Sequence, residues 1–470
     1  MVPRLVIAGT QSGVGKTSIT LGLVAAFRRQ GLRVQTFKVG PDYLDPTYLA
    51  LASGRPCYNL DGWMSGKDYL QELFSRACAD ADLAVIEGVM GLFDGADPAG
   101  LSGSTAEVAL WLNAPVVLVA NAHGAGRSFA ATVHGFATFI PDLRVAGVIA
   151  NRCGSVRHAE GLRASLAAAA LPPLLGAVSR GGLPELPSRH LGLVSAEETL
   201  FSSTALTQLA DGVEAAVSLD QVLETARFAP EFAPANIRES RRPPAAPNVR
   251  LGIAKDEAFH FYYPDNLEAL ELAGCELIPF SPLHDAMLPE GLNGIYIGGG
   301  YPEEHAQELA ANRSMLESIR QFAECNRVIY AECGGLMYLS LGIEALDGAR
   351  HQMLGIVPVW TRMCPRRKSL GYVEVTLVRE CHWGRAGDVL RGHEFHYSEM
   401  MPSAETSSLM RLGQAACATL PCELAYELRY RRSENPAAEG FLIGNVLASY
   451  AHLHFASRPD AVLHFISRLK

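Results

Sequence analysis

The chain lacks the features that would place it in a membrane, outside the cell or on nucleic acid. No apolar stretch among its 470 residues is long enough to span a bilayer. The ten cysteines are scattered and form no C-x-x-C pair, so we expect reduced thiols in a cytoplasmic protein. Residues 4–8 lead straight into a glycine-rich loop, which predicts a first strand and not a signal peptide. A net charge of −9 does not favour nucleic acid as a partner.

The sequence also shows no internal repeat, and its 49% hydrophobic and 19% charged residues suit two or three α/β domains. In the first half, nearly continuous apolar runs alternate with helical patterns, as expected for parallel strands covered on both faces. The spacing of apolar residues predicts a helix over Thr17–Gln30. The predicted strands are Leu5–Ala8, Val34–Lys38, Leu83–Glu87, Val116–Ala120 and Val145–Ala150.

A change of character between residues 226 and 248 predicts a linker. Proline-rich runs in this segment cannot propagate a helix or a central strand. We therefore predict one domain at 1–225, a linker at 226–248 and a second domain at 249–470. The second strand–helix series has predicted strands at Arg250–Ala254, Gly294–Ile297, Val328–Ala331 and shortly before His452.

The run Gly9-Thr-Gln-Ser-Gly-Val-Gly-Lys-Thr17 is typical of a nucleotide phosphate loop. Backbone N–H groups and the dipole at a helix N-terminus favour anions. Lys16 would reach the β- and γ-phosphates, and the Thr17 hydroxyl would be a ligand of Mg²⁺. The leading glycine comes one residue earlier than in the common motif, but the flanking strand and helix disfavour a chance glycine-rich turn. The predicted ATP-binding residues of the loop are Gly13, Val14, Gly15, Lys16, Thr17 and Ser18.

This loop variant resembles those of dethiobiotin synthetase and the ParA/MinD ATPases. A signature lysine opens the ParA/MinD motif, whereas this chain has Gln11 there, which disfavours a partitioning ATPase. Lys38 ends the second predicted strand and would lie near the phosphates in a doubly wound sheet. A solvated strand end is the alternative for Lys38.

Acidic residues fall where ligands bind in open α/β sheets, beyond the carboxyl ends of strands. Glu87 directly ends an apolar strand and is the best carboxylate ligand for Mg²⁺, which takes one or two carboxylates together with phosphates. Asp42, Asp45 and Asp94 each stand beside Pro or Gly, so turn chemistry explains them equally well.

Cys333 follows an apolar strand and precedes two glycines. A thiol in a tight strand-to-helix turn is exposed at a positive helix end, so we expect a lowered pKa and a nucleophilic thiolate. The Gly298–Gly300 turn follows another strand and offers N–H groups for an oxyanion hole, with Gly299, Gly300 and Gly334 as the predicted donors. A buried structural cysteine is the alternative, which the paired glycines disfavour.

A base for this thiol is offered by His452 or His454. Side chains alternate along a strand, so at most one of the two should face Cys333.

Three motifs of the second half resemble class I glutamine amidotransferases of the cobalamin pathway: Ile297–Glu303, Ala331–Tyr338 and Ser449–Phe455. Over its whole length the chain resembles the cobyrinic acid a,c-diamide synthase family, called hydrogenobyrinic acid a,c-diamide synthases where the substrate lacks cobalt. Longer stretches that carry the resemblance are Phe37–Asp45, Glu87–Gly95, Phe261–Leu267 and Leu390–Ser398.

The resemblance implies an α/β fold in two parts. These are a dethiobiotin-synthetase-like P-loop domain with a doubly wound parallel sheet and a flavodoxin-like class I amidotransferase domain. It implies that Cys333 is the nucleophile and His452 the base. Many class I relatives carry Glu two residues after this histidine, but here the residue is His454, so we expect a Cys–His dyad. The remaining implied roles are Mg²⁺ binding by Thr17, Glu87 and Asp45, and substrate binding by Asp42, Tyr43 and Asp94.

The function implied is that of a carbon–nitrogen ligase. It would use ATP and L-glutamine to amidate the a- and c-acetate carboxylates of a corrinoid polycarboxylate, cobyrinate or hydrogenobyrinate, through a carboxyl phosphate. Arg366–Lys368 and Arg391 could receive this acidic macrocycle or form an ordinary solvated loop. The expected partners are small molecules, with no membrane or nucleic acid; a homodimer is compatible with the sequence. Rival functions are Ni-sirohydrochlorin a,c-diamide synthase, cobyric acid synthase and a ParA/MinD-like regulatory ATPase.

Overall fold

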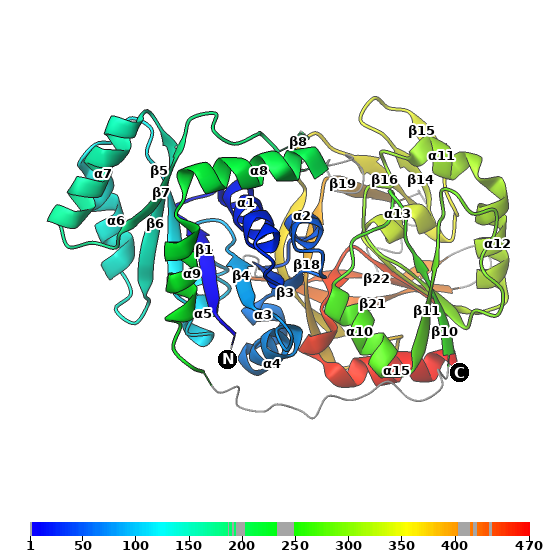
Figure 1. The fold of residues 1–470 in the computed structure, drawn as a ribbon. Coiled ribbons are helices and arrows are strands. Elements are labelled where there is room, and N and C mark those ends of the chain that lie inside the picture. The colour runs from blue at the N-terminus through cyan, green and yellow to red at the C-terminus, as the bar shows by residue number, and fades with distance from the viewer. Residues whose placement is uncertain are drawn as a thin grey trace. The chain divides into compact units, whose positions relative to one another are not determined.

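The structure is a computed structural model that describes residues 2–186, 188–189, 192–193, 203–232, 249–402, 414–416, 421–431 and 435–470. The chain divides into two compact units, residues 1–239 and 240–470 (Figure 1). Helix α9 of the first unit ends at Arg227, beyond the predicted domain boundary at 225. Residues 233–248 of the predicted linker lie outside the described residues. The linker therefore stays a prediction.

The first unit is built on a parallel sheet. In its described part, seven strands run in the order β3-β2-β4-β1-β5-β6-β7, with β1 between β4 and β5. The strands are β1 (Arg4–Gly9), β2 (Val34–Val39), β3 (Tyr58–Leu60), β4 (Leu83–Glu87), β5 (Val116–Asn121), β6 (Val145–Cys153) and β7 (Leu174–Ser179), besides the short pair β8 (Ser188–Arg189) and β9 (Gly192–Leu193). The helices are α1 (Lys16–Arg29), α2 (Leu44–Ser53), α3 (Gly62–Ser65), α4 (Lys67–Ala77), α5 (Thr105–Trp111), α6 (Ser128–Thr138), α7 (Val156–Ala168), α8 (Ser203–Ala216) and α9 (Leu219–Arg227).

Both faces of this sheet are covered by helices. Leu5 and Ile7 of β1 belong to a core shared with α1 and α8. Val6 and Ala8 point the other way, into a core shared with α4 and α5. This alternation within a wholly buried strand explains why the sequence reads as a continuous apolar run.

The second unit combines parallel and antiparallel strands in one sheet. Its parallel part has the order β11-β10-β12-β13-β23, which is the 2-1-3-4-5 order of flavodoxin-like folds. Beyond β23 the sheet continues through antiparallel pairs as β22-β21-β17-β18-β24, with β20 beside β21. A separate sheet has the order β15-β14-β16-β19.

The elements of the second unit begin with β10 (Val249–Ala254), α10 (Pro264–Leu272), β11 (Cys275–Phe280), β12 (Gly294–Ile297), α11 (Ala306–Ala311), α12 (Arg313–Glu324), β13 (Val328–Glu332) and α13 (Gly334–Leu339). They continue with β14 (Ser340–Glu344), β15 (Arg350–Gln352), β16 (Val357–Met363), β17 (Ser369–Leu377), β18 (Val389–His396) and β19 (Ser398–Pro402). The last are β20 (Gln414–Ala416), β21 (Pro421–Tyr430), β22 (Ala437–Ile443), β23 (Val446–Ser449), β24 (His452–Leu453), the 3₁₀ helix η1 (Phe455–Ser457) and α15 (Pro459–Leu469).

The fold class predicted from the sequence is confirmed. All nine predicted strands are present, and helix α1 begins and ends one residue before the predicted Thr17–Gln30. The antiparallel strands of the second unit are not among the predicted elements. In β16, for example, buried and half-buried residues alternate, and this pattern is weaker than a continuous apolar run. No helix in the described ranges has the length and apolar character needed to cross a bilayer.

Candidate active sites

The phosphate loop joins the carboxyl end of β1 to the start of α1. Gly13 and Gly15 have φ angles of 74° and 93°, in the left-handed region that glycine adopts without strain. Gly15 is the N-cap of α1, and no side chain caps this helix end. The N–H groups of the first turn of a 14-residue helix therefore face the loop, as an anion site requires.

Asn151, at the end of β6, fixes the shape of the loop. Its side-chain amide donates to the Val14 carbonyl at 2.7 Å. A Cβ atom on Gly15 would lie 2.3 Å from the Asn151 Nδ2 atom, so only glycine fits there. Asn151 is not among the predicted site residues, although it directly follows the predicted strand Val145–Ala150.

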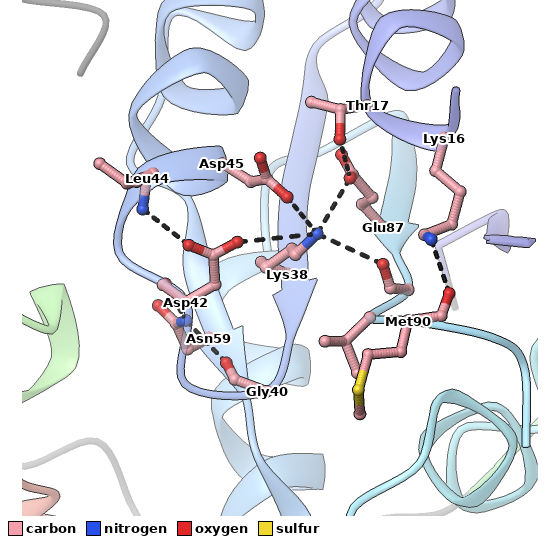
Figure 2. Close-up of polar contacts among 12 residues, drawn as sticks. Lys16, Thr17, Lys38, Gly40, Asp42, Leu44, Asp45, Asn59, Glu87 and Met90 are labelled. Carbon is pink, nitrogen blue, oxygen red and sulfur yellow. Dashed lines mark hydrogen bonds and ion pairs between the residues drawn. The ribbon is translucent and has the colours of Figure 1, made fainter. Parts of the chain in front are cut away.

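Lys16 turns back over the loop. Its ammonium group donates to the Met90 carbonyl at 2.6 Å (Figure 2). The Gln11 carbonyl lies 3.5 Å from the same ammonium group. Burial, followed by the nearby charge of Lys38, lowers the pKa of Lys16. The positive charges of Lys16 and Lys38 are therefore close enough to repel each other.

Lys38 lies among carboxylates at the ends of β2 and β4 (Figure 2). Its buried ammonium donates to Asp45, to the Glu87 Oε1 atom at 2.9 Å and to the Gly88 carbonyl at 3.3 Å. Asp42 lies 4.0 Å away. Burial alone would lower the pKa of Lys38, but the charges of Asp45 and Glu87 outweigh burial and raise it.

The Lys38 cluster leads to a stability prediction. Lys38→Met would leave Asp45 and Glu87 buried without their counter-charge, and breaking such a pair costs about 3–5 kcal/mol. We expect chemical denaturation of the whole chain to show this loss. Arg33→Met is the matched control: it breaks an exposed 3.0 Å pair with Asp82, and such pairs contribute up to about 1 kcal/mol. Equal denaturation midpoints for the two variants would contradict the prediction.

Thr17 and Glu87, two of the predicted Mg²⁺ ligands, meet directly. The Thr17 hydroxyl donates to the Glu87 Oε1 atom at 2.7 Å. The Glu87 Oε2 atom is buried and has no hydrogen-bond partner among the described residues. Hard oxygen donors with spare capacity beside a phosphate loop suit Mg²⁺. Among the described residues, no group of three or more His, Cys, Asp or Glu side chains is arranged so that it could hold a metal ion.

Asp42, Tyr43 and Asp94, the predicted substrate residues, lie in turns near the same strand ends. The Asp42 Oδ1 atom accepts from the Leu44 N–H at 2.8 Å, and the Asp94 Oδ2 atom accepts from the Gly91 N–H at 2.8 Å. Tyr43 is the N-cap residue of α2. Partial burial, with the Asp45 charge as the next cause, raises the pKa of Asp42 to about 7. Asp42 and Asp94 therefore both make turn bonds, and Asp42 also reaches the Lys38 cluster.

In the second unit, Cys333 occupies a sharp turn between β13 and α13. Its φ and ψ angles are 49° and −102°, an unusual conformation for a residue with a Cβ atom. A Cβ on Gly335 would lie 2.3 Å from the Ile297 carbonyl oxygen, so the helix packs tightly against β12. Nucleophile turns of other enzymes share this strand–turn–helix arrangement, so the geometry is compatible with the role predicted for Cys333.

The predicted low pKa of Cys333 is wrong for this geometry. The side chain is only 6% exposed, and burial, followed by the charge of Glu303, raises the pKa of the thiol. A hydrogen bond from the Gly334 N–H acts in the opposite direction without reversing the shift. The sequence indicates the turn and the helix end, but it does not indicate which distant residues bury the sulfur and exclude water from it.

The Gly298–Gly300 turn lies between the Cys333 turn and His452. A Cβ on Gly334 would lie 3.1 Å from the Gly300 nitrogen, and a Cβ on Gly299 would lie 2.5 Å from the His452 Cε1 atom. The Gly299 carbonyl accepts from the His260 and Phe261 N–H groups, which fixes the turn. Three glycines therefore let the predicted nucleophile, oxyanion donors and base approach one another.

His452 and His454 occupy different surroundings. His452 is 1% exposed, and its ring stacks on His393 of β18 with centroids 5.0 Å apart. Burial lowers the pKa of His452 well below its usual value, so the ring is neutral and can accept a proton. His454 instead lies 3.3 Å from Asp265 through its Nε2 atom.

The basic residues considered for the macrocycle lie on the surface of the second unit. Arg366, Arg367 and Arg391 are exposed. Lys368 forms an ion pair with Glu399 at 2.5 Å, so its positive charge is offset by that carboxylate.

The two sites define a class of enzyme: a glutamine amidotransferase joined to a nucleotide-binding P-loop domain. Comparison with known families agrees with this class. Residues 5–194 match the CobQ/CobB/MinD/ParA nucleotide binding domain, and residues 250–460 match the CobB/CobQ-like glutamine amidotransferase domain.

Full-length relatives give the family. The chain is 56% identical over 468 residues to the cobyrinate a,c-diamide synthase of Syntrophotalea carbinolica, covering 99% of this chain and 98% of the relative. It is 43% identical over 465 residues to that of Leptospira interrogans (99% and 98% covered) and 41% identical over 463 residues to that of Salmonella typhimurium (98% and 97% covered). The chain belongs to the cobyrinate a,c-diamide synthase family.

Proposed function

We propose that this chain amidates the a- and c-acetate carboxylates of cobyrinate or hydrogenobyrinate, using ATP and the amide nitrogen of glutamine. The observation that carries the proposal is the presence in one chain of a glycine-shaped phosphate loop and a cysteine in a strand-to-helix turn. The full-length similarity to cobyrinate a,c-diamide synthases supports the choice of substrate.

At the first site, the loop would hold ATP while a substrate carboxylate attacks its γ-phosphate. The N–H groups of residues 13–18 and the ammonium of Lys16 would bind the phosphates. Lys38 lies beside Glu87 and adds positive charge near the transferring group. Mg²⁺ held by Thr17 and Glu87, with Asp45 nearby, would supply neutralising charge for the phosphates.

Asp42 would face the substrate carboxylate, which requires a group that can donate a hydrogen bond to an anion. Burial and the Asp45 charge raise the pKa of Asp42, so this carboxyl is protonated more easily than an ordinary aspartate, and a protonated carboxyl can donate a hydrogen bond to an anion. Tyr43 and Asp94 would complete this part of the site. The product of the step is a carboxyl phosphate and ADP.

At the second site, Cys333 would attack the glutamine side-chain amide. The thiol is protonated, so its proton must pass to neutral His452 as the carbon–sulfur bond forms. The Gly299, Gly300 and Gly334 N–H groups would stabilise the oxyanion. His452 then protonates the leaving nitrogen, which departs as ammonia, and water hydrolyses the thioester to glutamate. Ammonia displaces phosphate from the carboxyl phosphate and gives the amide.

Arg366, Arg367 and Arg391 would receive the acidic macrocycle, because these side chains are exposed and planar guanidinium groups pair with carboxylates.

A direct assay tests the proposed function. The purified chain is given ATP, Mg²⁺ and glutamine with cobyrinate, hydrogenobyrinate or Ni-sirohydrochlorin, and the products are read by mass spectrometry. We expect two successive amidations of cobyrinate or hydrogenobyrinate and none when ATP is omitted. Amidation of Ni-sirohydrochlorin alone would replace the proposed substrate. Absence of any amide product would refute the activity.

A further inference from the structure

Glu332 is a buried carboxylate to which the mechanism above gives no role. It directly precedes Cys333 and is 1% exposed. Its Oε2 atom lies 3.9 Å from the Nδ1 atom of His452. Its Oε1 atom accepts from the N–H of Leu453, the next residue along β24, at 2.9 Å. Glu332 therefore contacts both the ring and the backbone of the segment that carries the proposed base.

Two tyrosines hold this carboxylate in place. The Tyr296 hydroxyl donates to the Oε2 atom at 2.6 Å, and the Tyr330 hydroxyl donates to the Oε1 atom at 2.6 Å. With the Leu453 N–H, the carboxylate accepts three hydrogen bonds. Burial of a carboxyl group without donors is costly, so this environment is built for an acceptor.

We propose that Glu332 is the positioning residue of the glutaminase site: it orients His452 and stabilises the imidazolium that forms when Cys333 loses its proton. A carboxylate beside Nδ1 favours the tautomer with the proton on that atom, which leaves the Nε2 lone pair for the thiol. The proposal rests on the roles proposed above for Cys333 and His452.

Glu332 would thus serve in place of the acid that many class I relatives carry two residues after the histidine. In this chain that position is His454, whose Nε2 atom lies 3.3 Å from Asp265. The acid would come from the residue before the nucleophile. During the reaction Glu332 stays ionised, and the proton moves only between the thiol, the Nε2 atom and the leaving nitrogen.

The proposal predicts a pH dependence for glutamine hydrolysis. Burial raises the pKa of Glu332 to about 7, against the opposing effect of its three donors. Loss of this proton creates the active form, so the rate should rise with pH through about 7. Burial keeps most of the neighbouring groups from titrating there. It raises the pKa of Cys333 and of Tyr262, Tyr296, Tyr330 and Tyr426, and it lowers the pKa of His452 and, to about 3, that of His393.

Glu439 is a further ionisable group that could contribute to a pH profile, and His396 is a further neighbour of His452. Burial raises the pKa of Glu439 to about 8, but this carboxylate binds Ser449 and Tyr450. His396 acts on His452 through its charge. Both groups are unchanged in the Glu332 variants. Any pH dependence that they cause should therefore persist in those variants, whereas the part caused by Glu332 should be lost.

The test measures glutamine hydrolysis and ammonia-driven amidation by the full chain across pH. In Glu332→Gln we expect kcat for glutamine to fall about 100-fold, the size of a general acid–base contribution, with KM for glutamine unchanged. Ammonia-driven amidation should equal that of the wild type. The rise in the rate of glutamine hydrolysis near pH 7, called the limb below, should vanish. A wild-type kcat, or a limb that survives unchanged, would overturn the proposal. So would equal losses with both nitrogen sources.

Two tyrosine variants keep the test valid if Glu332→Gln fails to fold. Tyr330→Phe removes one donor to the carboxylate, which should move the limb to higher pH. Tyr426→Phe is the matched control, because its buried hydroxyl has no hydrogen-bond partner within the described ranges; its limb should not move. Identical profiles for the two would overturn the proposal. Cys333→Ala is assayed in parallel: glutamine hydrolysis by that variant would refute the roles proposed for the site itself.

Discussion

Replacing Lys16 with alanine is expected to abolish amide formation from both glutamine and ammonia. Lys16 is the first residue of α1 at the phosphate loop, and its ammonium is close enough to Lys38 for the two charges to interact. Removal of one preorganised group that stabilises transition-state charge typically costs about 100–1,000-fold in kcat. Amide formation is measured by mass spectrometry with each nitrogen source in turn.

The control for this variant is Lys67→Ala. Lys67 is also the first residue of a helix, α4, but its side chain is exposed. The control should retain wild-type rates with both nitrogen sources. Full ammonia-driven activity in Lys16→Ala would show that the loop does not serve carboxylate activation.

Replacing Cys333 with alanine should separate the two half-reactions. Without the sulfur no thioester can form, so glutamine-dependent amidation should fall to background while ammonia-dependent amidation continues. The substitution keeps the Cβ atom and so adds no new strain at the φ angle of 49°. Both activities are measured on the same preparation, with ammonium chloride as the second nitrogen source.

Cys325→Ala is the matched control for Cys333→Ala. Cys325 is a free and exposed cysteine at the end of α12. Its replacement should leave glutamine use unchanged. Glutamine-driven amidation that persists in Cys333→Ala would mean that another group is the nucleophile.

Local sequence patterns were sufficient for the parts of the sites that lie on single segments. The strand–loop–helix around Gly15 and the carboxylate that ends β4 follow from apolar runs and from the residues at their ends. The strand-to-helix turn at Cys333 does so as well. These features depend on backbone geometry within a few residues, which the order of the residues specifies directly.

Contacts between distant segments could not be predicted from such patterns. Glu332 meets Leu453 and the Tyr296 hydroxyl only because β13 and β12 pair and β24 lies close by. The burial of Cys333 depends in the same way on segments far along the chain, such as the Phe395 carbonyl at 3.8 Å from its sulfur. A pKa depends on this complete environment, which is why the local pattern predicts the wrong direction of shift for the Cys333 thiol.

The hydrogen bond from Asn151 to Val14 has a consequence for the order in which the protein can assemble. The phosphate loop lies within the first 17 residues, yet its clamp comes from a residue 137 positions later, at the end of β6. During synthesis the loop must therefore wait for most of its sheet. Contacts of such long sequence separation form late and slowly. The phosphate loop is therefore among the first segments of this unit to be synthesised and among the last to reach its folded conformation.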